Sequence, residues 1–230
     1  MSTEMPPQRR DSELLQILAT EHWSLLATRA LTYQESLGRV SMFLTILSGA
    51  VIALALVAQA DHFGTAFIAI AIFMLTVVCL TGVFTVARLQ ALNRDDFRWV
   101  VAMNRIRNAY LSLHPELASH FTTSSNDDML GALKTLGIDP VGADRLGSMF
   151  HGLQTLPGML SMIVASVGGA VGGLVAVGFG AEPAVVLLSG IGSFVLAALV
   201  MVLWLAGSVR HLIPDLEPRF PSPPKPPTSE

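Results

Sequence analysis

Several side chains that could ligate a metal lie close together near the middle of the chain. His114 and His120 flank Pro115-Glu116, and Asp127-Asp128 follow soon after. Metal-binding motifs hold ligands at short fixed spacings, as in H-E-x-x-H or paired cysteines, and these residues do not match them. We therefore expect no metal and no cofactor. The chain also has no nucleophile elbow, P-loop or dinucleotide fingerprint, so no motif predicts catalytic residues or an enzyme.

Three arginines could hold an anion. Arg94, Arg98 and Arg105 share one face of a predicted helix that follows a membrane span, where basic side chains bind lipid phosphates or another anionic ligand. The competing interpretation is an ordinary solvated helix face, neutralised by nearby carboxylates such as that of Asp95. Both interpretations are open at the level of the sequence.

Small residues recur every four positions in the third apolar run. Such rows let helix backbones approach closely within a membrane. The row can pack against the fourth span of the same chain, form a seam between subunits of an oligomer, or line a pore; of the last two we favour the seam. The residues concerned are Ser161, Ala165, Gly168, Gly169, Gly172 and Gly173.

Four apolar runs require a membrane. The chain has 230 residues, of which 52% are hydrophobic and 13% charged, about half the charge of an ordinary soluble domain. Crossing the hydrocarbon takes about 20 residues in a helix, and each run is that long. The first should be a retained anchor, because it begins too late for a cleaved signal. The predicted spans are residues 40–60, 64–87, 158–180 and 184–207.

The first two spans extend into long amphipathic helices, which makes residues 11–113 one long helical hairpin. Asp11 or Ser12 should cap its first helix at Glu13, and Pro115 should end its second. Because both extensions leave the membrane on one side, their apolar stripes can pair as an antiparallel stalk. The first stripe comprises Leu15, Leu18, Ala19, His22, Leu26, Ala30, Tyr33 and Leu37; the second comprises Leu92, Trp99, Met103, Ile106, Tyr110 and Leu113.

The remaining segments are short. Residues 1–10 are predicted to be disordered, and residues 114–157 to form a helical connector that packs on the stalk, with helices over Asp127–Leu136 and Ala143–Leu156 and a turn at Asp139-Pro140. Residues 158–207 form the second hairpin. The tail, residues 208–230, holds most of the prolines and should be extended or disordered.

The distribution of basic residues predicts the orientation. All 14 Lys and Arg lie in the N-terminal segment, the central segment or the tail, whereas the hairpin tips carry only Asp61 and Glu182 as charged residues. By the positive-inside rule both termini and the connector are cytoplasmic. The net charge of −3 is too small to favour nucleic acid as a partner.

One central stretch carries a resemblance to known proteins. Asn104-Arg105-Ile106-Arg107-Asn108-Ala109-Tyr110, followed by His114-Pro115-Glu116-Leu117 and Phe121, resembles small uncharacterised actinobacterial multi-pass membrane proteins. The resemblance covers roughly the first 130 residues and implies no particular activity. The plan of a long cytosolic helix entering a transmembrane hairpin is also similar to the SLATT two-span modules of bacterial conflict systems. That likeness implies a pore opened by a nucleotide-sensing partner, although the second hairpin here departs from it.

The sequence as a whole predicts an all-α integral membrane protein of a bacterial inner membrane. Its four transmembrane helices form two hairpins, the first extended into a cytosolic antiparallel helical stalk. We expect a non-enzymatic scaffold or signal-responsive assembly, homo-oligomeric in the lipid bilayer, with a cytosolic protein partner for its helical region. The alternative is a pore-forming effector or ion channel gated through the stalk, because an uncharged apolar constriction can gate conduction by dewetting.

Overall fold

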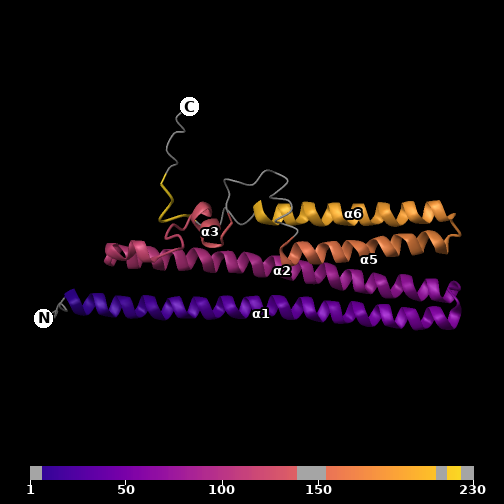
Figure 1. Ribbon diagram of the computed structural model, residues 1–230, viewed down its shortest axis with the longest axis horizontal. Coiled ribbons are helices and arrows are strands. Elements are labelled where there is room, and N and C mark those ends of the chain that lie inside the picture. Colours follow the sequence, from indigo (N-terminus) through magenta and orange to yellow (C-terminus); the bar gives the residue numbers. More distant parts are fainter. Residues whose placement is uncertain (1–6, 139–153, 211–216, 224–230) are drawn as a thin grey trace, which may run out of the picture. The chain divides into compact units, whose positions relative to one another are not determined.

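The computed structural model describes residues 7–138, 154–210 and 217–223, and its regular secondary structure is helical (Figure 1). Helix accounts for 86% of the structure, with no strand in the described ranges. The predicted turn at Asp139-Pro140, most of the predicted helix Ala143–Leu156, and residues 211–216 and 224–230 of the tail lie outside these residues. The elements are α1 (Pro7–Asp61), α2 (Thr65–Leu113), the 3-10 helix η1 (Pro115–His120), α3 (Met129–Thr135), α5 (Leu156–Gly178) and α6 (Pro183–Arg210).

Four of these helices, α1, α2, α5 and α6, are long and apolar enough to cross a membrane. This agrees with the four predicted spans, each of which falls almost entirely within one helix. At 55 residues α1 is about 80 Å long at 1.5 Å per residue, whereas the hydrocarbon of a bilayer is about 30 Å thick. A single crossing of that thickness therefore takes less than half of the length of α1.

The helix ends follow local chemistry. Helix α1 begins at Pro7, earlier than the predicted cap at Asp11 or Ser12, because proline at a first helical position has no N–H to leave unpaired. Between α1 and α2 the Asp61 carboxylate accepts the backbone N–H of Phe67 at 2.7 Å. Helix α2 ends at Leu113, directly before His114-Pro115, as predicted.

The chain divides into two compact units, and both α1 and α2 pass from one into the other. The first, here called the polar unit, comprises Met1–Tyr33, Asn93–Asp144 and Leu212–Glu230. The second, called the apolar unit, comprises Gln34–Leu92 and Arg145–His211 and holds the apolar runs of all four long helices.

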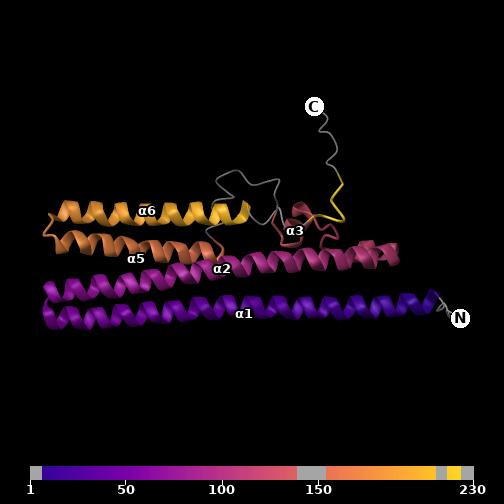
Figure 2. The same cartoon turned by 180° about the vertical axis from the view of Figure 1, so that it is seen from behind.

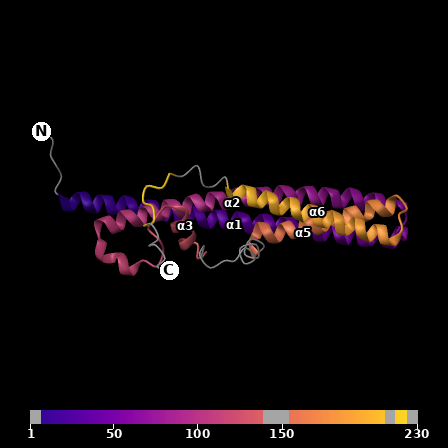
Figure 3. The same cartoon turned by 90° about the horizontal axis from the view of Figure 1, so that it is seen from above.

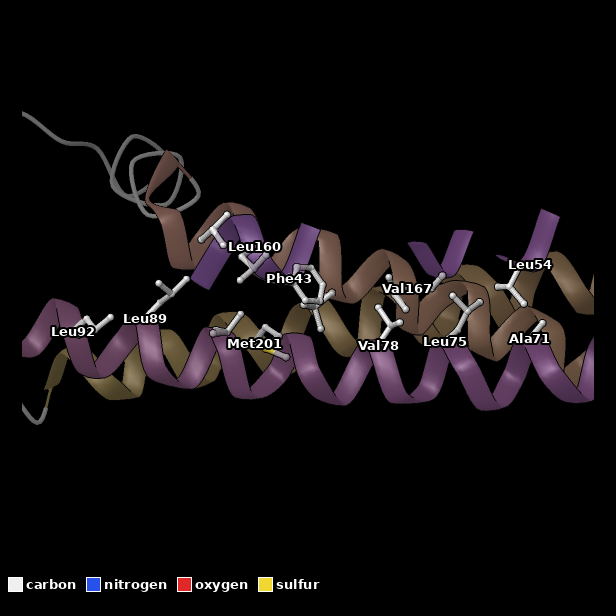
Figure 4. Packing of buried hydrophobic residues seen from close by; sticks show 14 residues of the cluster. Phe43, Leu54, Ala71, Leu75, Val78, Leu89, Leu92, Leu160, Val167 and Met201 are labelled. Atoms are coloured by element: carbon white, nitrogen blue, oxygen red, sulfur yellow. The ribbon is translucent and has the colours of Figure 1, made fainter. Parts of the chain in front are cut away.

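The core of the apolar unit is a cluster of aliphatic side chains around Phe43, which is fully buried (Figure 4). It draws on α1, α2, α5 and α6, with Val78, Leu160 and Met201 among its members. Helices α5 and α6 pack against each other and lie side by side when seen from the front and from behind (Figure 1, Figure 2). At the edge of this unit the Glu35 carboxylate binds Arg88 of α2 at 3.0 Å.

Two smaller clusters hold the polar unit together. In one, Leu25 of α1 packs with Met103 and Ile106 of α2. In the other, Ala132 of α3 packs with Val100 and neighbouring residues of α2, so that α3 lies beside α2 (Figure 1, and from above in Figure 3). The predicted α2 stripe is correct, since each of its members is buried or half-buried.

The predicted α1 stripe is wrong by one residue along part of its length. Leu26 is 42% exposed and Tyr33 is 62% exposed, whereas Leu25 and Ser36 are buried. The rotation of α1 is fixed by polar contacts that a hydrophobic pattern does not reveal. In the polar unit, Arg29 forms a two-bond ion pair with Asp96, at 2.6 and 3.0 Å. This pair turns Leu25, one helical turn earlier, toward α2.

Candidate functional site: a binding site for the C-terminal tail

Asp127 is the centre of the best-defined polar site in the described residues. It lies in the loop before α3, and its side chain is completely buried. Its carboxylate accepts a hydrogen bond from Arg105 Nε at 2.7 Å, from the backbone N–H of Arg219 at 2.9 Å and from that of Phe220 at 2.7 Å. A buried carboxylate needs such partners, because an uncompensated charge in the interior is strongly unfavourable.

The ligand of this site is the C-terminal tail of the same chain. Arg105 and Asn126–Asp128, here called the tail-binding site, hold residues 217–222 almost entirely through backbone atoms. Arg105 Nη2 donates to the carbonyl of Glu217 at 3.0 Å. Asn126 Nδ2 donates to the carbonyls of Phe220 and Pro221, at 3.3 and 3.2 Å. A site that binds backbone atoms in this way is specific for an extended conformation and not for particular side chains.

Asp128 has two roles at once. Its Oδ1 accepts the N–H of Gly131 at 2.8 Å, which makes Asp128 the N-cap of α3. The same oxygen accepts the hydroxyl of Ser222 at 2.9 Å, and Oδ2 accepts the Ser222 N–H at 2.9 Å. The cap that starts α3 therefore also binds the tail.

The pattern of prolines in the tail matches the acceptors of the site. The segment reads Pro218-Arg219-Phe220-Pro221-Ser222-Pro223, and proline has no N–H. Its three backbone N–H groups, on Arg219, Phe220 and Ser222, are all donated to Asp127 or Asp128. The two carboxylates thus satisfy every backbone donor that this segment offers.

The electrostatics of both carboxylates favour the bound tail. Burial raises the pKa of Asp127, but the N–H groups of Arg219 and Phe220 and the Arg105 guanidinium lower it more, so that the net shift is downward. Burial likewise raises the pKa of Asp128, and hydrogen bonds from Ser222 and Gly131 reverse this effect. Both groups are therefore ionised, and able to accept hydrogen bonds, at neutral pH.

A buried polar network behind the loop holds the site in shape. Asn104 is fully buried; its Nδ2 donates to the Asn126 carbonyl at 2.7 Å, and its Oδ1 accepts from Arg107 at 2.6 Å and from Thr135 at 2.9 Å. Burial, followed by the charge of Arg29, lowers the pKa of Arg107. Networks whose members are all satisfied make a loop rigid.

Gly131 allows α3 to approach this loop closely. A Cβ atom on Gly131 would collide with the backbone carbonyl of Asn126. Glycine is therefore required for the first turn of α3 to close against the residues that bind the tail.

The three arginines predicted to bind lipid or an anion are not one cluster with one role. Arg105 is bound to Asp127 and to the tail. Arg98 is half-exposed and lies 3.5 Å from Asp95, in agreement with the solvated-face interpretation, while Arg94 is half-buried. For Arg105 the bound anion is thus a carboxylate of the chain itself.

The histidines of the central stretch lie apart from this site. His114 Nδ1 is 2.9 Å from the Glu116 carboxylate, and His120 is hydrogen-bonded to Ser119 at 3.2 Å. In the part of the chain that the structure describes, no three His, Cys, Asp or Glu side chains are grouped so that they could hold a metal ion.

The small-residue face of α5 is directed into the apolar unit. All six residues predicted for packing are buried or half-buried. A Cβ on Gly169 would come within 2.9 Å of Phe194 Cβ, and one on Gly172 would collide with Ser193 Oγ, both on α6. The Ser189 hydroxyl also donates to the Gly172 carbonyl at 2.9 Å. Of the three uses considered for this face, the geometry favours packing within the chain.

Sequence reasoning missed the pairing between the tail and the loop, which are about 90 residues apart. A signal was present: prolines at alternating short intervals leave few donors, and two adjacent aspartates offer matching acceptors. Only the folded chain shows that they meet. No family model, no curated protein and no solved structure matches this chain.

Proposed function

We propose that this chain is a non-enzymatic, signal-responsive assembly of a bacterial inner membrane, in which the tail-binding site is the part that responds. The four apolar helices cross the bilayer as two hairpins, with both termini cytoplasmic. Its polar unit forms a cytosolic stalk that meets a protein partner, and copies of the chain associate in the membrane. The one-sided distribution of Lys and Arg supports this orientation.

The observation that carries the proposal is the donor match between the tail and the two aspartates. Three backbone N–H groups of residues 218–223 are all bound by Asp127 and Asp128. A contact made through backbone groups is open to competition by another extended, proline-containing segment with the same donor spacing. In the resting state the tail occupies the tail-binding site. The signal is a segment of a partner protein that displaces the tail from this site.

The helices connect this site to the membrane. Arg105 and the buried Asn104 belong to α2, which continues without interruption from Thr65 through the apolar unit to Leu113. When another segment replaces the tail, the contacts of α2 change in the part of the helix that lies outside the predicted span. A change at the site is thereby linked to the span by one continuous helix.

The pore-forming alternative has less support. It requires the uncharged face of α5 to line a lumen, whereas Gly169 and Gly172 are close to side chains of α6. A scaffold or responsive assembly does not require this face of α5 to be open to a lumen.

The test is competition for the site in the full-length protein. A fluorescent peptide with the sequence of residues 217–223 should bind weakly to the intact chain. It should bind at least tenfold more tightly when residues 217–230 are deleted, which frees the site. Asp127→Ala in that variant should abolish binding, because it removes the acceptor of two N–H groups and of Arg105.

A matched control is Asp95→Ala, which removes an exposed carboxylate from α2 without touching the site. Binding that survives Asp127→Ala, or equal binding with and without the native tail segment, would contradict the proposed role of the site.

A further inference from the structure

The half of α1 in the polar unit carries two parallel rows of residues, each with the alternating four- and three-residue spacing of a coiled-coil seam. The first, here called the inner seam, is buried or half-buried and comprises Leu18, His22, Leu25, Arg29 and Thr32. The second, called the outer seam, is shifted by one residue and comprises Ala19, Trp23, Leu26, Ala30 and Tyr33.

The outer seam is the more apolar of the two, yet its large side chains are exposed. Trp23 is 69% exposed, Leu26 42% and Tyr33 62%. The inner seam, in contrast, includes a histidine, an arginine and a threonine. A row of apolar side chains on one face of a helix is the usual mark of a packing surface, and on the surface of a soluble unit such a row marks an interaction site.

Lipid does not cover the outer seam in the proposed topology. The uncharged run that spans the membrane begins at Val40, after Arg39, and fills the thickness of the hydrocarbon by itself. The seam also lacks the basic face of a helix that lies on anionic lipid, because the only Lys or Arg between Asp11 and Gly38 is Arg29, which is paired with Asp96. The occupant of the outer seam is therefore a protein surface.

We propose that this occupant is a second copy of the chain, with the outer seam of α1 packed in parallel and in register against the outer seam of its partner. The inference rests on the proposed function, whose homo-oligomer it provides with a contact surface. In this proposal the subunits contact each other through the outer seam of α1 and not through the glycine face of α5.

The membrane supplies the register for such a pair. Every copy inserts in the same orientation, so α1 of each copy enters the bilayer at the same residue, near Val40. Equal residues then lie at equal heights, with Leu26 facing Leu26 and Tyr33 facing Tyr33. Confinement to one bilayer also raises the effective concentration of the two seams.

The charges beside the outer seam suit a pair of identical helices. In a parallel pair, like charges at flanking positions would repel across the interface. The flanking residues on one side, Thr20, Ala27 and Gln34, are uncharged. On the other side, Arg29 is neutralised by Asp96 of its own chain at 2.6 Å, and burial followed by the charge of Arg107 lowers the pKa of His22, which keeps it neutral. A different helix selected by charge would require charged flanks, which this surface lacks.

Cysteine cross-linking in native membranes tests the surface directly. Cys79 is the only cysteine, so Cys79→Ala provides the background for Leu26→Cys and for the matched control Ser24→Cys. Both positions are exposed in the single chain, but they lie about 200° apart around the helix. Oxidation should join Leu26→Cys into a dimer of two chains at least tenfold more efficiently than Ser24→Cys. Equal yields, no dimer at position 26, or a product whose mass is not two chains would overturn the proposal.

The mass of the assembly in nanodiscs separates this inference from the proposed function. Wild type and Ser24→Asp should form the same oligomer, whereas Leu26→Asp should fall to a smaller assembly with unchanged helix content, since Leu26 is already exposed in the chain. An oligomeric wild type without cross-linking at position 26 refutes the outer seam alone. A monomeric wild type refutes both the seam and the proposed homo-oligomer.

Discussion

Asp127 and Phe220 are bonded to each other in both directions. The Phe220 N–H donates to Asp127 Oδ1 at 2.7 Å, while the Asp127 N–H donates to the Phe220 carbonyl at 3.2 Å. Each residue thus satisfies a donor and an acceptor of the other, although they lie at distant points of the chain. This reciprocal pair fixes the tail in one position on the loop before α3.

The bound tail should remain in place at neutral pH and be released by strong acid. The pKa values of Asp127 and Asp128 are lowered below the ordinary 3.8, so their contribution to binding is complete above that value. It is lost as the pH falls through their lower values in the folded protein. Amide hydrogen exchange of Arg219, Phe220 and Ser222 should be slow at pH 7 and should accelerate, relative to free peptide, only after the pH has fallen below 3.8. Release between pH 5 and 7 would mean that other groups control the tail.

Leu25 and Leu26 are neighbours in the sequence that should respond in opposite ways to truncation. Leu25 is 6% exposed and packs against α2, so Leu25→Ala should destabilise the polar unit by about 2–3 kcal/mol. Leu26→Ala should change the stability of the monomer by less than about 0.5 kcal/mol. Thermal melting in a detergent that keeps the chain monomeric measures both. Comparable losses for the two variants would show that α1 is rotated from the position described.

Gly172 should tolerate no added side chain. Its missing Cβ leaves the space that Ser193 of α6 occupies, so Gly172→Ala forces α5 and α6 apart and should cost about 1–3 kcal/mol. Gly192→Ala is the matched control, because nothing lies within 4 Å of a Cβ at that position. The melting temperature in detergent should fall for the first variant alone. A loss of oligomeric state without a loss of monomer stability would instead place this glycine between subunits.

The orientation can be tested with single cysteines in a Cys79→Ala background. Gln59→Cys and Glu182→Cys lie at exposed positions near the two tips that carry no Lys or Arg. They should react with a membrane-impermeant thiol reagent on intact spheroplasts. Ser119→Cys, exposed in η1, should react only after lysis. Labelling of Ser119→Cys from outside would reverse the topology.

The sequence by itself determined the elements that local chemistry controls. The absence of charge in residues 40–60 and in the three later runs is enough to identify four membrane-length helices, because unpaired charge is too costly in hydrocarbon. Pro115 ends α2 because proline cannot continue the hydrogen-bond pattern. The helix predicted over Asp127–Leu136 is present as α3, Met129–Thr135, which begins after Asp128 because that carboxylate accepts an N–H of the first turn.

Only the tertiary structure decided which faces are buried and which distant groups meet. Helix α1 has apolar residues on adjacent faces, so hydrophobic periodicity alone does not predict which of Leu25 and Leu26 is buried. The ion pair of Arg29 with Asp96 orients the helix so that Leu25 is the buried one. The tail has few backbone donors and the loop has two adjacent acceptors, but nothing in either segment specifies that Asp127 contacts Phe220. A hydrogen bond across such a separation exists only when the fold between its partners brings them together, and no short-range pattern encodes that.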